Sequence, residues 1–297
     1  TPAKTLPPGH TLRLSTQIAK SDCKSSGAFF MTEAGVAEEL PTEPIGYLKV
    51  VTLGESTLSA EELTSIAGNL ANGAVIDLGE ATFATTEFPM DFTRKTNLQE
   101  IALPRNIQTF TPSTYNSGAF YGCEKLTRGT LPEGLTAIGQ NCFRNCAKLE
   151  SIELPSSVRT LDIYAFYGCK LLTSVVIPEG VEAIPRFLFD SCTALTDVTL
   201  PSTLKSIGAE AFEATGLEEI TIPESVTTIE SSVFKNCKSL ERIQFPDALT
   251  AIPANLCNAC SALTTINMPS KLETVGNDAF YNCGKLQDVT FPETLKS

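Results

Sequence analysis

Apolar residues recur along most of the chain at a fixed spacing. A leucine returns every 23 residues, with a single 22-residue step, at Leu126, Leu149, Leu172, Leu195, Leu217, Leu240, Leu263 and Leu286. The surrounding unit reads Leu-x-x-Ile-x-Leu-Pro-x-x-Leu-x-x-Ile-Gly-x-x-Ala-Phe-x-x-Cys-x-x, and residues 263–284 are its best copy. A period of this length predicts a solenoid, in which each unit forms one coil and buries its apolar side against the neighbouring coils.

Each part of the unit predicts a structural element. In Leu-x-x-Ile-x-Leu, apolar and polar positions alternate, which is typical of a strand with one buried face, and the following proline ends that strand. The segment Leu-x-x-Ile-Gly predicts a second short extended piece and a turn. The segment x-x-Ala-Phe-x-x-Cys predicts one or two helical turns with Ala, Phe and Cys facing inward. Stacking at about 4.8 Å then produces one parallel sheet and a core with a phenylalanine column.

Two further columns define where the units lie. Proline marks nine units, at Pro104, Pro132, Pro155, Pro178, Pro201, Pro223, Pro246, Pro269 and Pro292. The phenylalanine column consists of Phe120, Phe143, Phe166, Phe189, Phe212, Phe234 and Phe280, and Cys257 replaces it once. An earlier degenerate unit places Ile76, Leu78 and Phe92 in the matching positions. We therefore predict repeats over residues 73–297, with the last unit incomplete.

A helix is predicted immediately before the repeats. Ser59 is a typical N-cap, Glu62 completes a capping box, and Leu58 packs against Leu63 as a hydrophobic staple. Asn72 and Gly73 form the expected stop signal, and the helix would cover the apolar end of the first coil.

The rest of the N-terminal region shows weaker patterns. Residues 47–53 predict a strand, and residues 11–15 and 28–32 are weaker strand candidates. The expected organisation is an extended segment over 1–45, an N-terminal cap of strand plus helix over 46–72, and the repeats.

This repeat resembles the BspA-like family of leucine-rich repeats, which occurs on surface proteins of anaerobic bacteria and in some protists. The resemblance implies an α/β repeat solenoid, a right-handed leucine-rich repeat stack with a parallel β-sheet on one face and short helical turns on the other. It also implies a bacterial cell-surface or secreted scaffold that acts in protein binding or adhesion and is not an enzyme. Some family members bind extracellular-matrix proteins or other bacteria, so such surface proteins are the expected partners.

Charge and hydropathy narrow the range of partners. The formal net charge of −12 disfavours nucleic acid and anionic lipid as partners. No uncharged apolar run approaches the roughly 18 residues of a membrane span, so membrane association would require a lipid anchor or another domain. The chain starts at Thr1 without an initiator Met or apolar signal region, and we expect that a leader was removed or left out.

Nine of the ten cysteines lie in the repeats. One position of successive units is occupied by Cys123, Cys146, Cys169, Cys192, Cys237, Cys260 and Cys283, with Thr215 in the shortened unit. We predict free thiols that act as small core groups, because parallel stacking of identical side chains aims the sulfur atoms wrongly for disulfides. Cys257 and Cys260 form a nominal C-x-x-C, but both positions face inward and no second pair is available. Cys23 alone lies outside the repeats and could be a reactive thiol, although we expect a structural role.

Catalytic constellations are missing from the sequence. His10 is the only histidine and lies in a Pro-Pro-Gly-His segment outside the repeats. No P-loop or dinucleotide-binding glycine pattern occurs. The sequence therefore predicts no catalytic residues, no cofactor and no enzyme activity.

The strand positions that point away from the core are the candidate binding residues. They form two columns, the first with Glu100, Arg128, Ser151, Ser174, Asp197, Glu219, Arg242, Thr265 and Asp288, the second with Ala102, Thr130, Glu153, Val176, Thr199, Thr221, Gln244, Asn267 and Thr290. We select Arg128, Asp197, Glu219 and Arg242 as candidate ligand-binding residues. Asp197 and Glu219 on neighbouring coils could hold a calcium ion, or Arg242 could neutralise them. The columns contain neither an aromatic platform for sugars nor a basic stripe.

An insertion adds one more candidate. Residues 111–118 exceed the normal unit length and should bulge from the stack, with Tyr115 as the anchor-like side chain. Besides protein binding, a structural spacer and a glycan-capture accessory of a surface polysaccharide system remain open, and no individual side chain identifies a ligand.

Overall fold

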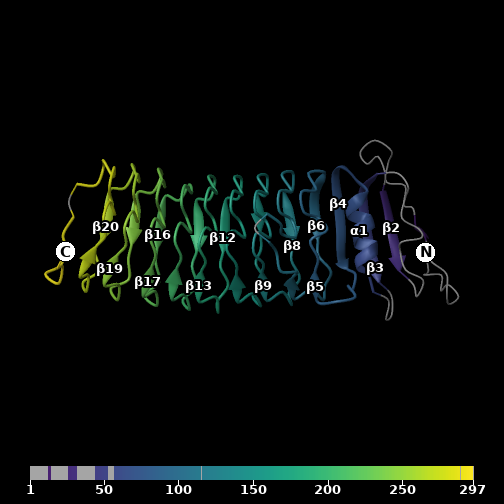
Figure 1. The fold of residues 1–297 in the computed structure, drawn as a ribbon, viewed down its shortest axis with the longest axis horizontal. Helices are drawn as coiled ribbons and strands as arrows, with labels where there is room; N and C mark the ends of the chain where they lie inside the picture. The colour runs from purple at the N-terminus through teal and green to yellow at the C-terminus, as the bar shows by residue number, and fades with distance from the viewer. Residues whose placement is uncertain are drawn as a thin grey trace.

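The computed structural model describes residues 13–14, 26–31, 44–52, 57–114, 116–287 and 289–296. Coils are stacked side by side along one long axis, with the N-terminal and C-terminal ends of the stack on opposite sides (Figure 1). Each repeat is one coil, so the molecule is a parallel β-solenoid, as the periodicity predicts.

The first strands of neighbouring coils pair in parallel in three runs, which are interrupted after residues 151–152 and after residues 197–199. Partners such as Arg128 and Ser151, or Ser174 and Asp197, lie 23 residues apart, which is the sequence period. The strands of this row are β6 (Leu98–Ala102), β8 (Arg128–Thr130), β10 (Ser151–Ile152), β12 (Ser174–Val176), β14 (Asp197–Thr199), β16 (Glu219–Thr221), β18 (Arg242–Gln244) and β20 (Thr265–Asn267). Strands β8, β12, β16 and β18 bury the middle residue and expose the residues on each side, because successive side chains point to opposite faces.

A second row of two-residue strands runs along another edge of the coils (Figure 1). It consists of β5 (Glu87–Phe88), β7 (Thr109–Phe110), β9 (Ala137–Ile138), β11 (Thr160–Leu161), β13 (Ala183–Ile184), β15 (Ser206–Ile207), β17 (Thr228–Ile229), β19 (Ala251–Ile252) and β21 (Thr274–Val275). These strands are the second extended piece that the Leu-x-x-Ile-Gly segment predicts. A turn separates the two rows, and the proline carbonyl accepts a hydrogen bond from the N–H three residues later, as in Pro132 and Leu135.

The sheet extends beyond the repeats at its N-terminal side. β4 (Leu70–Glu80) pairs with β6 and with β3 (Ile45–Thr52), which in turn pairs with β2 (Ser26–Met31). β2 pairs antiparallel with β1 (Arg13–Leu14). Two strands that precede the predicted cap in the chain, β1 and β2, therefore extend the sheet beyond β3. The sheet order is β1-β2-β3-β4-β6-β8-β10.

Helix α1 (Ala60–Gly68) lies in the coil that connects β3 to β4 (Figure 1). The predicted capping box is present: Glu62 N–H donates to Ser59 Oγ at 3.2 Å, and Ser59 N–H donates to a Glu62 carboxylate oxygen at 2.8 Å. The predicted end of the helix is wrong. Gly68 ends it with Asn69 as C-cap, because Leu70 already belongs to β4, whose pairing with Ile45 satisfies its backbone.

Replacing Ser59 with alanine should destabilise α1 locally. The variant loses the oxygen that accepts from Glu62 N–H, which we expect to cost about 1 kcal/mol. Hydrogen exchange of a peptide covering residues 60–68 measures this change. The matched control is Ser65→Ala, since Ser65 is exposed within the same helix and its hydroxyl bonds only to Glu61 O. Equal protection of α1 in the two variants would contradict the capping role.

The predicted helical turns on the far face of the repeats are not found in the described coils. Their segments contain turns with two left-handed residues four positions apart, such as Asn141 (φ 55°) and Asn145 (φ 61°). Alternate N–H groups donate to the next coil, as Phe143 N–H does to Ala165 O at 2.8 Å, while those between them close i→i−3 turns. A helix would keep these bonds within one coil. The alternating conformation links the coils on this face, which we call the turn face.

The core combines a phenylalanine column with a thiol column. From Phe120 to Phe234, rings of adjacent coils stack with centroids 5.2–5.8 Å apart and are fully buried. All repeat cysteines are buried and free, as predicted. Cys146 Sγ, for example, donates to Phe120 O at 3.1 Å, and the same bond recurs in the other coils. The thiol hydrogen bonds thus also connect neighbouring coils, with each thiol donating to the preceding coil.

Candidate functional site

The sheet face presents the predicted binding residues to solvent. Arg128 is exposed in β8, with Glu100 and Ser151 as its register neighbours. Asp197 is exposed at the start of β14 beside Ser174. Adjacent strands thus hold their outward side chains in straight columns, and the residue types make these columns small, polar and mixed in charge.

Glu219 forms an ion pair with Arg242, its register neighbour on the next strand. Arg242 Nη1 lies 3.2 Å from Glu219 Oε2, with both side chains well exposed. The strand ladder is interrupted between β14 and β16, where the sequence takes its 22-residue step. Of the two alternatives considered for Glu219, a calcium ion or neutralisation by Arg242, the structure contains the contact with Arg242. An ion pair this exposed contributes little to stability and leaves both groups accessible to a partner.

The insertion at residues 111–118 is fastened to the next coil. Ser113 Oγ donates to Gln140 O at 2.6 Å, and Asn141 Nδ2 donates to Thr114 O at 3.0 Å. Gly118 approaches so closely that a Cβ there would lie 2.4 Å from Asn141 O. The predicted anchor, Tyr115, lies outside the described residues.

The turn face carries aromatic and arginine side chains that the sequence interpretation missed. The guanidinium carbon of Arg144 lies 4.7 Å from the ring centroid of Tyr164, 5.0 Å from Tyr167 and 5.8 Å from Tyr121. Tyr164 also stacks on Phe187 at 4.7 Å. Reading the residues directly after and two before each core phenylalanine as columns would have found this group; these positions were instead interpreted as parts of a helical turn.

An acidic cluster lies on the same face, in the coil of Phe187 and in the coil that follows it. One carboxylate oxygen from each of Asp190, Glu210 and Glu213 lies within 4.8 Å of the others. Lys235 Nζ lies 3.1 Å from Glu213 Oε1, and Ser191 Oγ donates to Asp190 Oδ1 at 2.8 Å. Burial raises the pKa of Asp190 to about 6, opposed by the Ser191 hydrogen bond, with Glu213 raising it further. Burial and Glu213 also raise the pKa of Glu210. Lys235 neutralises part of this charge.

Replacing Asp190 with asparagine should make stability less dependent on pH. Because the pKa of Asp190 is raised from 3.8 to about 6 by folding, the folded state gains stability at low pH and loses it as pH rises through about 6. We expect Asp190→Asn to be more stable than the parent by about 1 kcal/mol near neutral pH, after allowance for solvent screening, and equal to it near pH 4.

Thermal unfolding followed by circular dichroism at the two pH values measures this difference. The matched control is Asp197→Asn on the exposed sheet face, which should change stability little at either pH. An Asp190→Asn variant that is less stable than the parent near neutral pH would show that the charged carboxylate is needed for folding.

Comparison with known families decides what the repeats are. The model of the BspA-type leucine-rich repeat region matches in six copies, over residues 86–194, 113–241 and 182–297. The chain belongs to the BspA-type leucine-rich repeat family. The match begins at residue 86, inside the degenerate first unit. Leucine-rich repeat solenoids are generally non-catalytic scaffolds.

Several bacterial leucine-rich repeat proteins of known structure are similar to this BspA-type chain. A Bacteroides ovatus protein is 20% identical, with 73% of each chain covered and a TM-score of 0.40. A leucine-rich cell surface protein from Faecalibacterium prausnitzii is 18% identical, with 99% of this chain and 90% of that chain covered and a TM-score of 0.39. The T. pallidum leucine-rich repeat protein is 18% identical, with 96% and 92% covered and a TM-score of 0.42. A comparison with curated proteins found no match.

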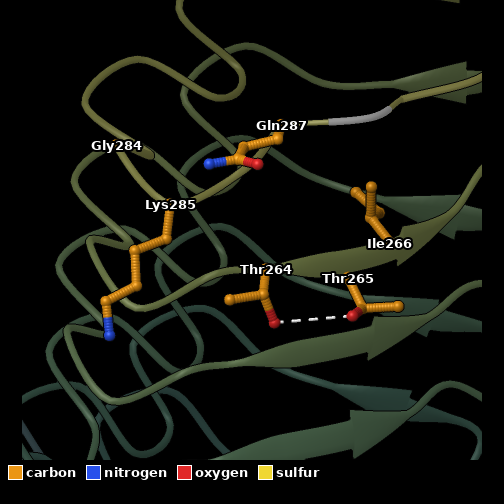
Figure 2. Close-up of a pocket in the computed structure, with 6 residues that line it drawn as sticks. All are labelled: Thr264, Thr265, Ile266, Gly284, Lys285 and Gln287. Carbon is orange, nitrogen blue, oxygen red and sulfur yellow. Dashed lines mark hydrogen bonds between the residues drawn. The ribbon is translucent and has the colours of Figure 1, made fainter.

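One hollow of about 580 Å³ lies beside β20, near the C-terminal end of the BspA-type stack (Figure 2). It is lined by Thr264, Thr265, Ile266, Gly284, Lys285 and Gln287. The two threonine hydroxyls lie 3.4 Å apart, and Lys285 supplies the charge of the lining. The lining thus offers two hydroxyls, one amide side chain and one ammonium group.

The thiols of the repeats are unsuited to nucleophilic or redox chemistry. Burial raises the pKa of Cys123 and of Cys237 to about 12 and that of Cys283 to about 11. Burial and a hydrogen bond that the Cys257 thiol donates to Cys260 also raise the pKa of Cys257, the first residue of the C-x-x-C. A nucleophile or metal ligand must be the thiolate, so these groups behave as core side chains at neutral pH.

In the described part of the chain, no helix is long and apolar enough to cross a membrane.

Proposed function

We propose that this protein is a non-enzymatic scaffold, at the cell surface or secreted, that binds protein partners. Family membership supports a scaffold role, and the location on the outside of the cell follows what the BspA-like resemblance implies. The ladder of parallel coils supplies the rigid frame that such a role requires.

The observation that carries the proposal is the exposed double column on the sheet face. Strand β18, for example, is hydrogen-bonded to coils on both sides, so binding a partner there would immobilise side chains but little backbone. From β6 to β20 the columns extend over roughly 35 Å, taking about 4.8 Å per coil. A surface of that length accommodates a protein–protein interface of standard size.

A binding experiment tests this function. Immobilised protein is exposed to a panel of purified extracellular-matrix proteins and glycans, and affinities are measured by biolayer interferometry. We expect a protein of the panel to bind, and Arg128→Ala or Arg242→Ala to weaken binding about tenfold, because arginine is prominent among interface hot spots.

The control variant is Lys238→Ala, an exposed cation away from the sheet-face columns. Protein binding that neither arginine variant affects would remove the sheet face as the site. A panel in which no protein binds would contradict the proposed function itself.

A further inference from the structure

A continuous row of stacked side chains crosses five consecutive coils of the turn face. Arg94 lies 5.4 Å from the ring centroid of Tyr121, Arg144 contacts Tyr121 and Tyr164, Tyr164 stacks on Phe187, and Arg186 lies 5.2 Å from the Phe187 centroid. We call these six residues the arginine–aromatic row. It begins and ends with arginine, although the chain as a whole carries a net charge of −12.

Three residues of the row, Arg94 (φ 58°) among them, occupy a left-handed backbone conformation that disfavours them. Tyr164 (φ 60°) and Phe187 (φ 59°) are left-handed, and the equivalent residues of other coils include Asn141, Asn255 and Asp278. Asparagine and aspartate tolerate this region, whereas bulky side chains are strained in it. Asparagine would be less strained in either coil, so the two rings are held there at a conformational cost.

The ring faces of the row are covered. The ring centroid of Tyr164 lies 4.7 Å from that of Phe187 and 4.7 Å from the guanidinium carbon of Arg144. The side chains of Tyr121, Tyr164 and Phe187 are all half-buried. Sugar rings stack on open aromatic faces, which this row lacks. Rigid tyrosine and arginine side chains are, in contrast, the residues most enriched in protein–protein hot spots.

The two terminal arginines are available to a partner. Arg94 and Arg186 are exposed, and the ion pairs and hydrogen bonds within the described chain involve neither guanidinium group. Ring contacts hold each guanidinium in place before binding, which lowers the entropy lost when it binds a carboxylate. The charge complement of this pair is a segment with two carboxylates.

We infer that the arginine–aromatic row binds an extended acidic segment of a protein partner, with two carboxylates six residues apart. The coils of Arg94 and Arg186 are four coil spacings of about 4.8 Å apart, which amounts to about 19 Å along the axis of the stack. Six residues of an extended strand span about 20 Å, and an even separation places both carboxylates on one face of it. The apolar side chains between them, on that same face, would lie over the edges of the rings.

This inference rests on the proposed protein-binding function and assigns to it a surface distinct from the sheet face. The test uses a fluorescent peptide containing Glu-Thr-Leu-Thr-Leu-Thr-Glu, titrated with the whole protein and followed by fluorescence anisotropy. Two matched peptides replace both glutamates with glutamine or move the second one to give Glu-Thr-Leu-Thr-Leu-Glu-Thr, which places the carboxylates on opposite faces.

We expect the first peptide to bind at least tenfold more tightly than either matched peptide. Arg94→Ala and Arg186→Ala should each weaken its binding about tenfold, whereas Arg128→Ala and Arg242→Ala should leave it unchanged. Because both row arginines are exposed, these variants should fold normally, and circular dichroism verifies this.

Three results would overturn the inference: no binding of the first peptide at millimolar protein, equal binding of the three peptides, or insensitivity to both row variants. Binding of polygalacturonate at these arginines in place of the peptide would assign the row to an acidic polysaccharide and would also overturn it. If a protein of the panel binds the sheet face while the peptide fails, the inference falls and the proposed function stands.

Discussion

Replacing Phe166 with alanine will lower the free energy of unfolding by about 4 kcal/mol. Phe166 is fully buried and stacks on Phe143 at 5.4 Å and on Phe189 at 5.5 Å. The variant removes both ring contacts and leaves a cavity in the middle of the column. Backbone bonds on both sides limit how far the neighbouring coils can move inward, so the cavity will not close. Urea unfolding followed by far-UV circular dichroism measures the loss.

Phe280→Ala is the matched control. Phe280 occupies the same position of the last complete unit, but it is only partly buried and its preceding neighbour in the column is Cys257. We expect a loss of less than about 2 kcal/mol for this variant. Equal losses at the two sites would show that the stacked column does not stabilise the coils in the way the ring geometry indicates.

Replacing Gly208 with alanine will also be strongly destabilising, by about 3 kcal/mol. An alanine Cβ would lie 2.7 Å from Arg186 N and 2.9 Å from the carbonyl carbon of Pro185. Both atoms are backbone atoms of the preceding coil, and Pro185 is rigid, so neither can move away at low cost. The two coils would have to separate at this point.

The control for this second prediction is Gly134→Ala. A Cβ at Gly134 would be 3.9 Å from its nearest neighbour, Ile107 O, which is an ordinary contact. We expect this variant to retain parental stability or to gain about 0.5 kcal/mol from a less flexible unfolded chain. Thermal unfolding of both variants provides the comparison, and an unchanged melting temperature for Gly208→Ala would show that the coils are less closely packed there.

Sequence periodicity predicted the parts of the fold that depend on burial. The strand rows, the stacked phenylalanines and the free thiols all follow from apolar residues that return to the same position of each coil. The capping box of α1 was also predicted, because Ser59 and Glu62 interact locally. These features require no knowledge of how one coil approaches the next.

The wrong predictions concern features that depend on contacts between coils. The pattern Ala-Phe-x-x-Cys has helical spacing, but N–H groups such as that of Phe143 donate to the adjacent coil, and i→i−3 turns replace the helix. The end of α1 was misplaced because pairing of Leu70 with Ile45 outweighs the stop signal at Asn72 and Gly73. The arginine–aromatic row was missed because its side chains come from separate coils.

Sheet face and turn face differ in the binding they support. Arg128 and Arg242 on the sheet face lie among small polar side chains, whereas Arg94 and Arg186 on the turn face are held against rings. Both surfaces are exposed, so a partner can reach either one without rearrangement of the coils. Variants of the two arginine pairs therefore separate the surfaces in a single binding assay.

The central claim is that each repeat forms one coil with its cysteine inside as a free thiol. Titration with Ellman's reagent, without reductant, tests it most directly. All nine cysteines of the described residues are buried and free, so we predict that at most one thiol, Cys23, reacts in the folded protein. All ten should react in guanidinium chloride. Several fast-reacting thiols in the folded protein, or fewer than ten in denaturant, would contradict the inward register of the repeats.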